Sequence, residues 1–167
     1  MPQRLPDFGR LVATLSEAAV RYVLIGGLAM RLQGCAHLTD DLDLCCARDN
    51  ENLQTLALAL TPHHPRLRGA PDDIPFLWDA RTLKMGVNFT LTTDLGNVDI
   101  LGYAAGVDSF EGLWSRAAIL DLDGVQVRVA SIEDLIAMKR AADRPQDRRH
   151  VAELEALRRL LEEETPE

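Results

Sequence analysis

The sequence contains few residues of the kind that form disulfide frameworks or zinc sites. Its 167 residues include only three cysteines, Cys35, Cys45 and Cys46, and an odd number with an adjacent pair does not predict a set of disulfides. No Cys-x2-Cys spacing occurs and the four histidines are scattered, which argues against a structural zinc site. Cys45 and Cys46 are therefore expected to pack as small hydrophobic side chains.

Long apolar runs are also missing. None approaches the ~20 residues needed to cross a bilayer, and the first residues, Met-Pro-Gln-Arg-Leu-Pro, lack the apolar segment of a signal peptide. Lysine is scarce, with Lys84 and Lys139 set against sixteen arginines, and the formal net charge is −8. This charge argues against broad adhesion to nucleic acid or anionic membranes, although a local group of arginines can still bind RNA. The sequence predicts a cytoplasmic protein that does not contact membranes.

The remaining composition is that of a globular chain. A hydrophobic content of 47% and this length suffice for one domain with a sizeable buried core. We expect residues 1–130 to form the core and residues 131–167 to form a helical segment packed on it. The expected order of elements is helix, strand, helix, strand, helix, two strands, a hairpin and two helices. This order predicts an α+β fold with a mixed β-sheet flanked by helices.

Periodicity and turn signals give the expected elements. Residues 61–81 hold four prolines and are expected to form a long loop, either functional or merely variable. Asn50 is expected to cap the third helix, Asp123-Gly124 to form the hairpin turn, and Pro145 to end the helix that Ser131 opens. The expected helices are 7–20, 28–33, 51–60, 131–144 and 147–161, the last using Val151, Leu154, Leu157 and Leu160, and residues 110–117 are expected to form a short helix or a turn. The expected strands are 22–25, 40–46, 84–92, 97–101, 118–122 and 125–129.

Two carboxylates in the second expected strand are the most informative feature. Asp41 and Asp43 are two residues apart, so a strand directs both to one face, while Leu42 and Leu44 point into the core. Two carboxylates on one face repel each other unless a divalent cation or a shared proton relieves the repulsion. The pattern favours a metal site, against the alternative of solvated acids at a strand end.

Two later residues extend this site. Asp99 lies in mid-strand between the apolar residues Val98 and Ile100, where an aspartate is uncommon without a partner. Lys139 falls on the apolar face of its helix, so it either snorkels to an edge or points into a cleft.

Gly26-Gly27 ends the first strand and opens a helix, whose N-terminal N–H groups suit a phosphate.

These residues resemble the signature of nucleotidyltransferases of the DNA polymerase β-like superfamily: Gly26-Gly27, thirteen residues, then Asp41-Leu42-Asp43. The resemblance covers about residues 22–160. More closely, the chain resembles the small bacterial group that includes AbiEii-type toxins of abortive-infection systems. That closer resemblance rests on Gly-Gly-x-Ala, Gly34, Thr39-x-Asp-x-Asp-Leu and Lys139-x-x-Ala142-x-Arg144-Pro-x-Asp147.

The resemblance implies the polymerase β-like fold and transfer of an NMP from an NTP to an acceptor hydroxyl on tRNA, a protein or a small molecule such as an antibiotic. It also implies a cognate antitoxin as a partner if the chain is toxin-like. Three carboxylates suffice for two Mg²⁺ (or Mn²⁺) ions, which stabilise the entering and departing oxygens. The implied catalytic and metal-binding residues are Asp41, Asp43 and Asp99, and the implied nucleotide-binding residues are Gly26, Gly27, Thr39, Lys139 and Arg144.

Several alternatives stay open at this point. Lys139 and Arg144 could instead form an interior salt bridge with Asp147, and Thr39 could support the backbone by hydrogen bonding. His37 stands where the family often has Arg, and a neutral imidazole would supply less charge to a phosphate. A catalytically inactive binding module, or a toxin–antitoxin partner that keeps the fold, is the second functional interpretation. Three mutually repelling carboxylates favour the enzyme.

Overall fold

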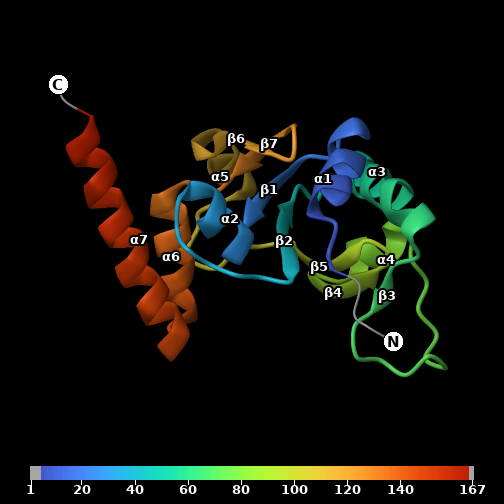
Figure 1. Ribbon diagram of the computed structural model, residues 1–167. Coiled ribbons are helices and arrows are strands. Elements are labelled where there is room, and N and C mark those ends of the chain that lie inside the picture. The colour runs from blue at the N-terminus through green and yellow to red at the C-terminus, as the bar shows by residue number, and fades with distance from the viewer. Residues whose placement is uncertain (1–4, 166–167) are drawn as a thin grey trace.

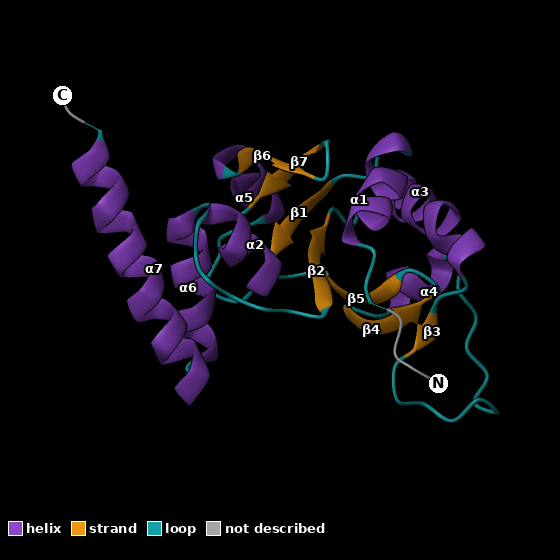
Figure 2. Cartoon of the chain, in the orientation of Figure 1, coloured by secondary structure: helices purple, strands orange, loops and turns teal. Residues whose placement is uncertain are grey.

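The computed structural model describes residues 5–165, which form one seven-stranded mixed sheet with helices around it (Figures 1 and 2). The sheet order is β3-β4-β5-β2-β1-β7-β6. The strands are β1 (Tyr22–Ile25), β2 (Asp41–Cys46), β3 (Arg66–Leu67), β4 (Asn88–Thr93), β5 (Gly96–Leu101), β6 (Ala118–Leu122) and β7 (Val125–Val129). The helices are α1 (Phe8–Glu17), α2 (Gly26–Gln33), α3 (Asn50–Leu60), α4 (Ala80–Met85), α5 (Phe110–Arg116), α6 (Ile132–Ala142) and α7 (Pro145–Glu164), with a 3-10 turn at Thr61–His63. This architecture confirms the predicted α+β fold.

The centre of the sheet places the predicted site. Strand β2 runs antiparallel to β1 and parallel to β5. The alternation predicted for these strands is confirmed, since Leu42, Leu44, Val98 and Ile100 are buried while Asp41, Asp43 and Asp99 lie on the more open face. Burial of these apolar side chains, each worth about 1.5–3 kcal/mol, holds the two strands in register.

Local signals in the sequence account for several element ends. The Asp7 side chain accepts a hydrogen bond from the Arg10 N–H at the start of α1, and the Ser131 side chain does the same for Asp134 in α6. Asp123-Gly124 forms the predicted turn between β6 and β7, with both residues at positive φ. Cys45 and Cys46 are buried in the core, as expected.

The segment expected to be a long loop contains short helical and strand elements. The strand expected at 84–92 begins later than predicted, at Asn88. Residues 61–81 contain the 3-10 turn, β3 and the start of α4, which is capped by the Asp79 side chain. Lys84 and Met85 therefore belong to a helix, and β4 begins at Asn88. The alternation of Met85 and Val87 was misleading because both side chains are largely exposed.

Other boundaries also differ. Helix α2 begins at Gly26 rather than Leu28, and the cap of α3 is Asp49 rather than Asn50. Helix α6 ends at Ala142, where Asp143 adopts a left-handed conformation, and Pro145 starts α7 instead of ending α6. Proline suits a first helical position because its missing N–H would be unpaired there.

The last helices lie side by side in Figure 1 and pack against each other. Leu154 of α7 is fully buried, whereas Leu160, expected on the same face, is 57% exposed. No helix within residues 5–165 has the length and apolar character to cross a membrane.

Candidate active site

Three aspartates from two neighbouring strands form the centre of the site. In the parallel β2–β5 pair, Asp43 lies opposite Asp99 and Asp41 lies opposite Asn97. Neighbouring strands are about 4.8 Å apart, so Asp43 and Asp99 are direct neighbours on one face of the sheet. The strand register thus places the three aspartates that the sequence singled out on one face of two neighbouring strands.

The acid–base equilibrium of the Asp43 carboxyl is strongly perturbed. Burial raises the pKa of the Asp43 carboxyl to about 7, helped by the nearby Asp99 charge, a side-chain hydrogen bond to Asp99 and the Asp41 charge, while Lys139 acts in the opposite direction. A raised pKa favours the neutral form of the Asp43 carboxyl, and this form lessens the repulsion among the three aspartates.

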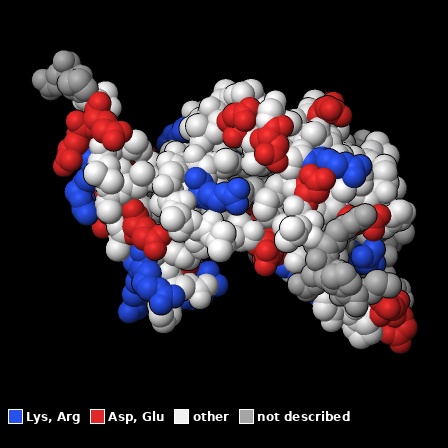
Figure 3. All heavy atoms as spheres, viewed as in Figure 1, with Lys and Arg blue, Asp and Glu red and all other residues white. Residues whose placement is uncertain are grey.

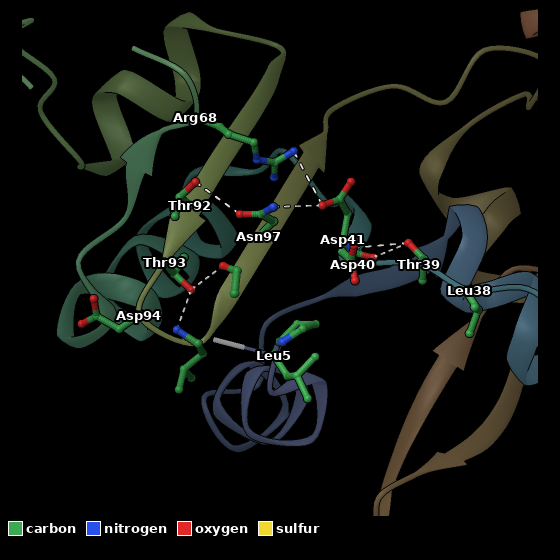
Figure 4. Close-up of a pocket in the computed structure, with 13 residues that line it drawn as sticks. Leu5, Leu38, Thr39, Asp40, Asp41, Arg68, Thr92, Thr93, Asp94 and Asn97 are labelled. Carbon is green, nitrogen blue, oxygen red and sulfur yellow. Dashed lines mark hydrogen bonds and ion pairs between the residues drawn. The ribbon is translucent and has the colours of Figure 1, made fainter. Parts of the chain in front are cut away.

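The positive charge of Arg68 also offsets the repulsion between the carboxylates, and the sequence did not indicate this residue. Its side chain follows β3 and donates from Nη2 to Asp99 Oδ1 at 2.7 Å and to the Leu91 carbonyl at 2.7 Å. Its Nη1 lies 3.8 Å from Asp41 Oδ1, and Figure 4 shows the guanidinium directed toward that carboxylate. The alternation Arg66-Leu67-Arg68 was the only available signal, and it is too short to predict a strand.

Asp41 is also held by polar neighbours on both sides. Asn97 donates from Nδ2 to Asp41 Oδ1 at 3.1 Å and accepts from the Thr92 hydroxyl (Figure 4). The Thr39 hydroxyl lies 3.3 Å from both the N–H and the carbonyl of Asp41. Thr39 thus contacts the backbone at the start of β2, as a supporting residue would.

The Gly26–Gly27 turn lies directly against these carboxylates. Gly26 has a φ of +70°, and a Cβ there would come within 2.1 Å of Asp43 Oδ2. A Cβ on Gly27 would lie 2.6 Å from the His37 ring and 3.1 Å from the Thr39 Cβ. No described side chain caps the N-terminus of α2, so its N–H groups are free to receive an anion beside Asp43.

Lys139 and Arg144 line the same cavity as Gly26 and Asp43, and both contact Asp147. The buried Asp147 carboxylate accepts from Arg144 Nε at 2.7 Å and lies 3.4 Å from Lys139 Nζ. The Arg144 side chain, acting first, lowers the pKa of Asp147 to about 2. Lys139 forms the interior ion pair with Asp147 that the sequence left open, and it also lines a cavity of about 280 Å³ together with Gly26 and Asp43.

His150 is a further neighbour that the sequence did not single out. Its ring packs edge-on against His37, with centroids 4.9 Å apart. Burial, followed by the charges of Lys139 and His37, lowers the pKa of His150. The His37 ring of this pair also lies against the Gly27 turn.

A second cavity meets the carboxylates from the Asp41 side. It has a volume of about 810 Å³ and is lined by Asp41, Arg68 and polar residues that include Thr39, Thr92 and Asn97 (Figure 4). Asp43 lines the smaller cavity and Asp41 the larger one. The carboxylates therefore lie between two spaces, which suits a reaction between two substrates.

Within residues 5–165, no three His, Cys, Asp or Glu side chains already converge into a metal cage. The donor set nevertheless fits Mg²⁺ or Mn²⁺, because all three groups are carboxylates and Asp43 and Asp99 are adjacent. The Arg68 guanidinium already places one positive charge beside these carboxylates.

Comparison with known structures places this architecture among nucleotidyltransferases. The chain matches ANT(2″)-Ia in complex with adenylyl-2″-tobramycin with a TM-score of 0.58 and 17% identity, over 94% of this chain and 95% of that one. It matches the lincomycin-bound lincosamide antibiotic adenylyltransferase LnuA with a TM-score of 0.59 and 14% identity, over 90% and 95%. A putative nucleotidyltransferase from Thermotoga maritima matches with a TM-score of 0.50 and 18% identity, over 93% of each chain. At these identities the likeness shows the fold.

No curated protein sequence matches the chain. The model of one protein family does, over residues 8–163, and that family is described as nucleotidyltransferase of unknown function (DUF6036). This match covers nearly the whole chain and includes all three aspartates, the Gly26–Gly27 turn and Lys139. The protein belongs to the DUF6036 family of nucleotidyltransferases and has the polymerase β-like nucleotidyltransferase fold.

Proposed function

We propose that this protein is a metal-dependent nucleotidyltransferase that moves an NMP from an NTP to an acceptor hydroxyl and releases pyrophosphate. One observation carries the proposal: Asp43 lies beside Asp99 in the β2–β5 register, and its carboxylate faces Gly26 so closely that no side chain fits there. The carboxylates, the Gly26–Gly27 turn proposed to bind phosphate and the cavity next to Asp43 thus lie together. In this proposal Asp41, Asp43 and Asp99 hold Mg²⁺ or Mn²⁺.

Each remaining residue has a role that follows from its position. The free N–H groups at the start of α2 bind NTP phosphates, which Gly26 and Gly27 allow to approach closely. Lys139 and Arg144, oriented by Asp147, neutralise phosphate charge in the cavity next to Asp43. When bound, the metal supplies charge stabilisation for the entering and departing oxygens. Asp99 helps to remove the proton of the acceptor hydroxyl, and Thr39 supports the start of β2.

The larger cavity beside Asp41 is the proposed acceptor site. Its polar lining can hydrogen-bond a hydroxylated molecule, a protein side chain or a tRNA end. On the face shown in Figure 3, the described basic and acidic side chains are interspersed and form no continuous basic track. Together with the antibiotic adenylylation named for two structural neighbours, this supports testing small hydroxylated molecules first. A tRNA target would support the toxin-like role with a cognate antitoxin.

The decisive experiment incubates the protein with Mg²⁺ and each labelled NTP, ATP included, in the presence of tRNA, cell lysate or hydroxylated small molecules. Label transfer that disappears in Asp43→Asn but persists in Asp73→Asn supports the proposal. Asp73 is a suitable control because it loses the same charge from an exposed loop position. Absence of transfer to every acceptor, together with absence of Mg²⁺-dependent NTP binding, would favour the non-catalytic binding module.

We also propose that residues 1–130 carry this chemistry as the core and that residues 131–167 pack on it to supply Lys139 and Arg144. The outermost residues of both segments lie outside the described part of the chain.

A further inference from the structure

Arg68 occupies an unusual position for a cation, directly at the carboxylates proposed to bind metal. Its Nη2 lies 2.7 Å from Asp99 Oδ1, and its Nη1 lies 3.8 Å from Asp41 Oδ1. The Arg68 side chain is 27% exposed and that of Asp99 is 25% exposed. An ion pair so shielded is screened less than a pair at the surface, so its charge affects the site strongly.

The guanidinium is held in place by more than its charge. The Leu91 carbonyl accepts from Nη2 at 2.7 Å, and the Arg68 N–H bonds to the Thr90 carbonyl across the β3–β4 pair. In contrast, the buried Nε of Arg68 has no hydrogen-bond partner in the described structure. A buried N–H without a partner costs free energy, so the contacts described here do not satisfy every donor of this side chain.

A divalent ion and Arg68 require the same oxygen atoms. A divalent ion held by Asp99 and Asp41 would take their carboxylate oxygens as ligands, at about 2.0–2.1 Å for Mg²⁺. The guanidinium already contacts these two groups from the side of the large cavity, which it lines. That cavity gives the side chain room to turn away from Asp99.

We propose that Arg68 is a resident cation that competes with the metal. It holds Asp99 and Asp41 together when no ion is bound, and it leaves Asp99 for the large cavity when a divalent ion binds. This inference rests on the proposed function, since it assumes that the three aspartates bind metal. Arg68 is then a positioning residue that sets how tightly the protein binds its ion before the nucleotide arrives.

The test is the affinity for Mn²⁺ alone, measured by calorimetry or by electron paramagnetic resonance without NTP. Arg68→Gln removes the competing cation and is expected to bind Mn²⁺ on the order of tenfold more tightly than the wild type. Arg66→Gln is the matched control, because Arg66 is two residues away and lies 3.8 Å from Asp94 instead of the site aspartates. Its affinity is expected to stay within about twofold of the wild type.

Thermal unfolding distinguishes competition from a purely structural role. In EDTA, Arg68→Gln is expected to unfold at a lower temperature than the wild type, because the carboxylates lose their counter-charge. Mn²⁺ is expected to raise its unfolding temperature more than that of the wild type. Arg68→Lys, which keeps the charge, tests the same point should the glutamine variant fold poorly, and its Mn²⁺ affinity is expected to stay close to that of the wild type.

The outcomes separate this inference from the proposed function. Equal Mn²⁺ affinity in wild type and Arg68→Gln, abolished in both by Asp43→Asn, overturns the role of Arg68 and leaves the metal site intact. Destabilisation of Arg68→Gln that Mn²⁺ does not reverse also overturns competition. Absence of Mn²⁺ binding in every variant, even with an NTP analogue present, overturns both proposals.

Discussion

Asp43 and Asp99 lie opposite each other on parallel strands, and the Asp99 charge adds to the burial that raises the pKa of Asp43. The Arg68 guanidinium, 2.7 Å from Asp99 Oδ1, places a positive charge beside the same carboxylates. Because of these contacts, the free energy of unfolding of the protein is expected to depend on pH and on metal binding, and both dependences can be measured.

Asp43 makes the metal-free protein less stable as the pH rises. Its folded-state pKa of about 7 lies above the ordinary 3.8, so the folded chain keeps a proton that the unfolded chain has released between these values. Stability from this group is therefore complete at acidic pH and is lost as the pH rises through about 7. Asp43→Asn, which removes this titration, is expected to gain about 2–3 kcal/mol over the wild type between about pH 5 and pH 8.

Urea unfolding in EDTA at the two pH values measures the difference. Asp73→Asn, an exposed position, is expected to show no such change with pH. A constant difference between Asp43→Asn and the wild type across this range would contradict the raised pKa.

Gly26 cannot carry a side chain without disturbing Asp43. A Cβ at this position meets Asp43 Oδ2 at 2.1 Å, in addition to the strain of a φ of +70°. Gly26→Ala is expected to cost about 3 kcal/mol or more and to weaken Mn²⁺ binding. Gly124→Ala separates the two effects, because Gly124 also has a positive φ, +86°, but a Cβ there would meet no atom of the described residues within 4 Å.

The control is expected to cost only about 1–2 kcal/mol, from backbone strain alone. Chemical unfolding of both variants gives the comparison, and equal losses would show that contact with Asp43 is unimportant.

The central carboxylates could be predicted from the sequence, but their counter-charge could not. Asp43 and Asp99 lie on strands long enough for the alternation of Leu42, Leu44 and Val98 to reveal which face each residue takes. Arg68 follows a strand of two residues, which no periodicity can detect, in a segment rich in proline. Its partners on β2 and β5 are far away in sequence and are set only by the order of strands in the sheet.

Asp147 fixes the junction between α6 and α7. Its buried carboxylate bonds to Arg144 and pairs with Lys139, and the low pKa means that this stability is present above about pH 4 and is lost as the pH falls through about 2. Asp147→Asn leaves two cations without their partner and is expected to cost about 3 kcal/mol at neutral pH. Urea unfolding measures this loss.

The matched control is Asp143→Asn, which breaks the neighbouring pair with Arg148. Both side chains of that pair are more than 60% exposed, so the expected loss is below about 1 kcal/mol. Similar losses in the two variants would contradict a special role for the buried carboxylate.

The two lysines of the chain offer a direct test of nucleotide binding. Lys139 is 16% exposed and lines the cavity next to Asp43, whereas Lys84 lies at the surface and donates to the Arg48 carbonyl. Lys139→Met removes a shielded charge from the proposed phosphate site and is expected to weaken binding of a fluorescent NTP analogue by about tenfold or more. Lys84→Met removes the same charge from the surface and is expected to leave the affinity unchanged.

The same pair of variants also reports on Asp43. Because Lys139 lowers the pKa of Asp43, its removal is expected to raise that pKa further and to move the pH-dependent loss of stability to higher pH. Unfolding in EDTA as a function of pH detects this shift. Weakened nucleotide binding without a shift would place Lys139 at the phosphates but outside the field of Asp43, whereas unchanged binding in Lys139→Met would exclude it from the nucleotide site.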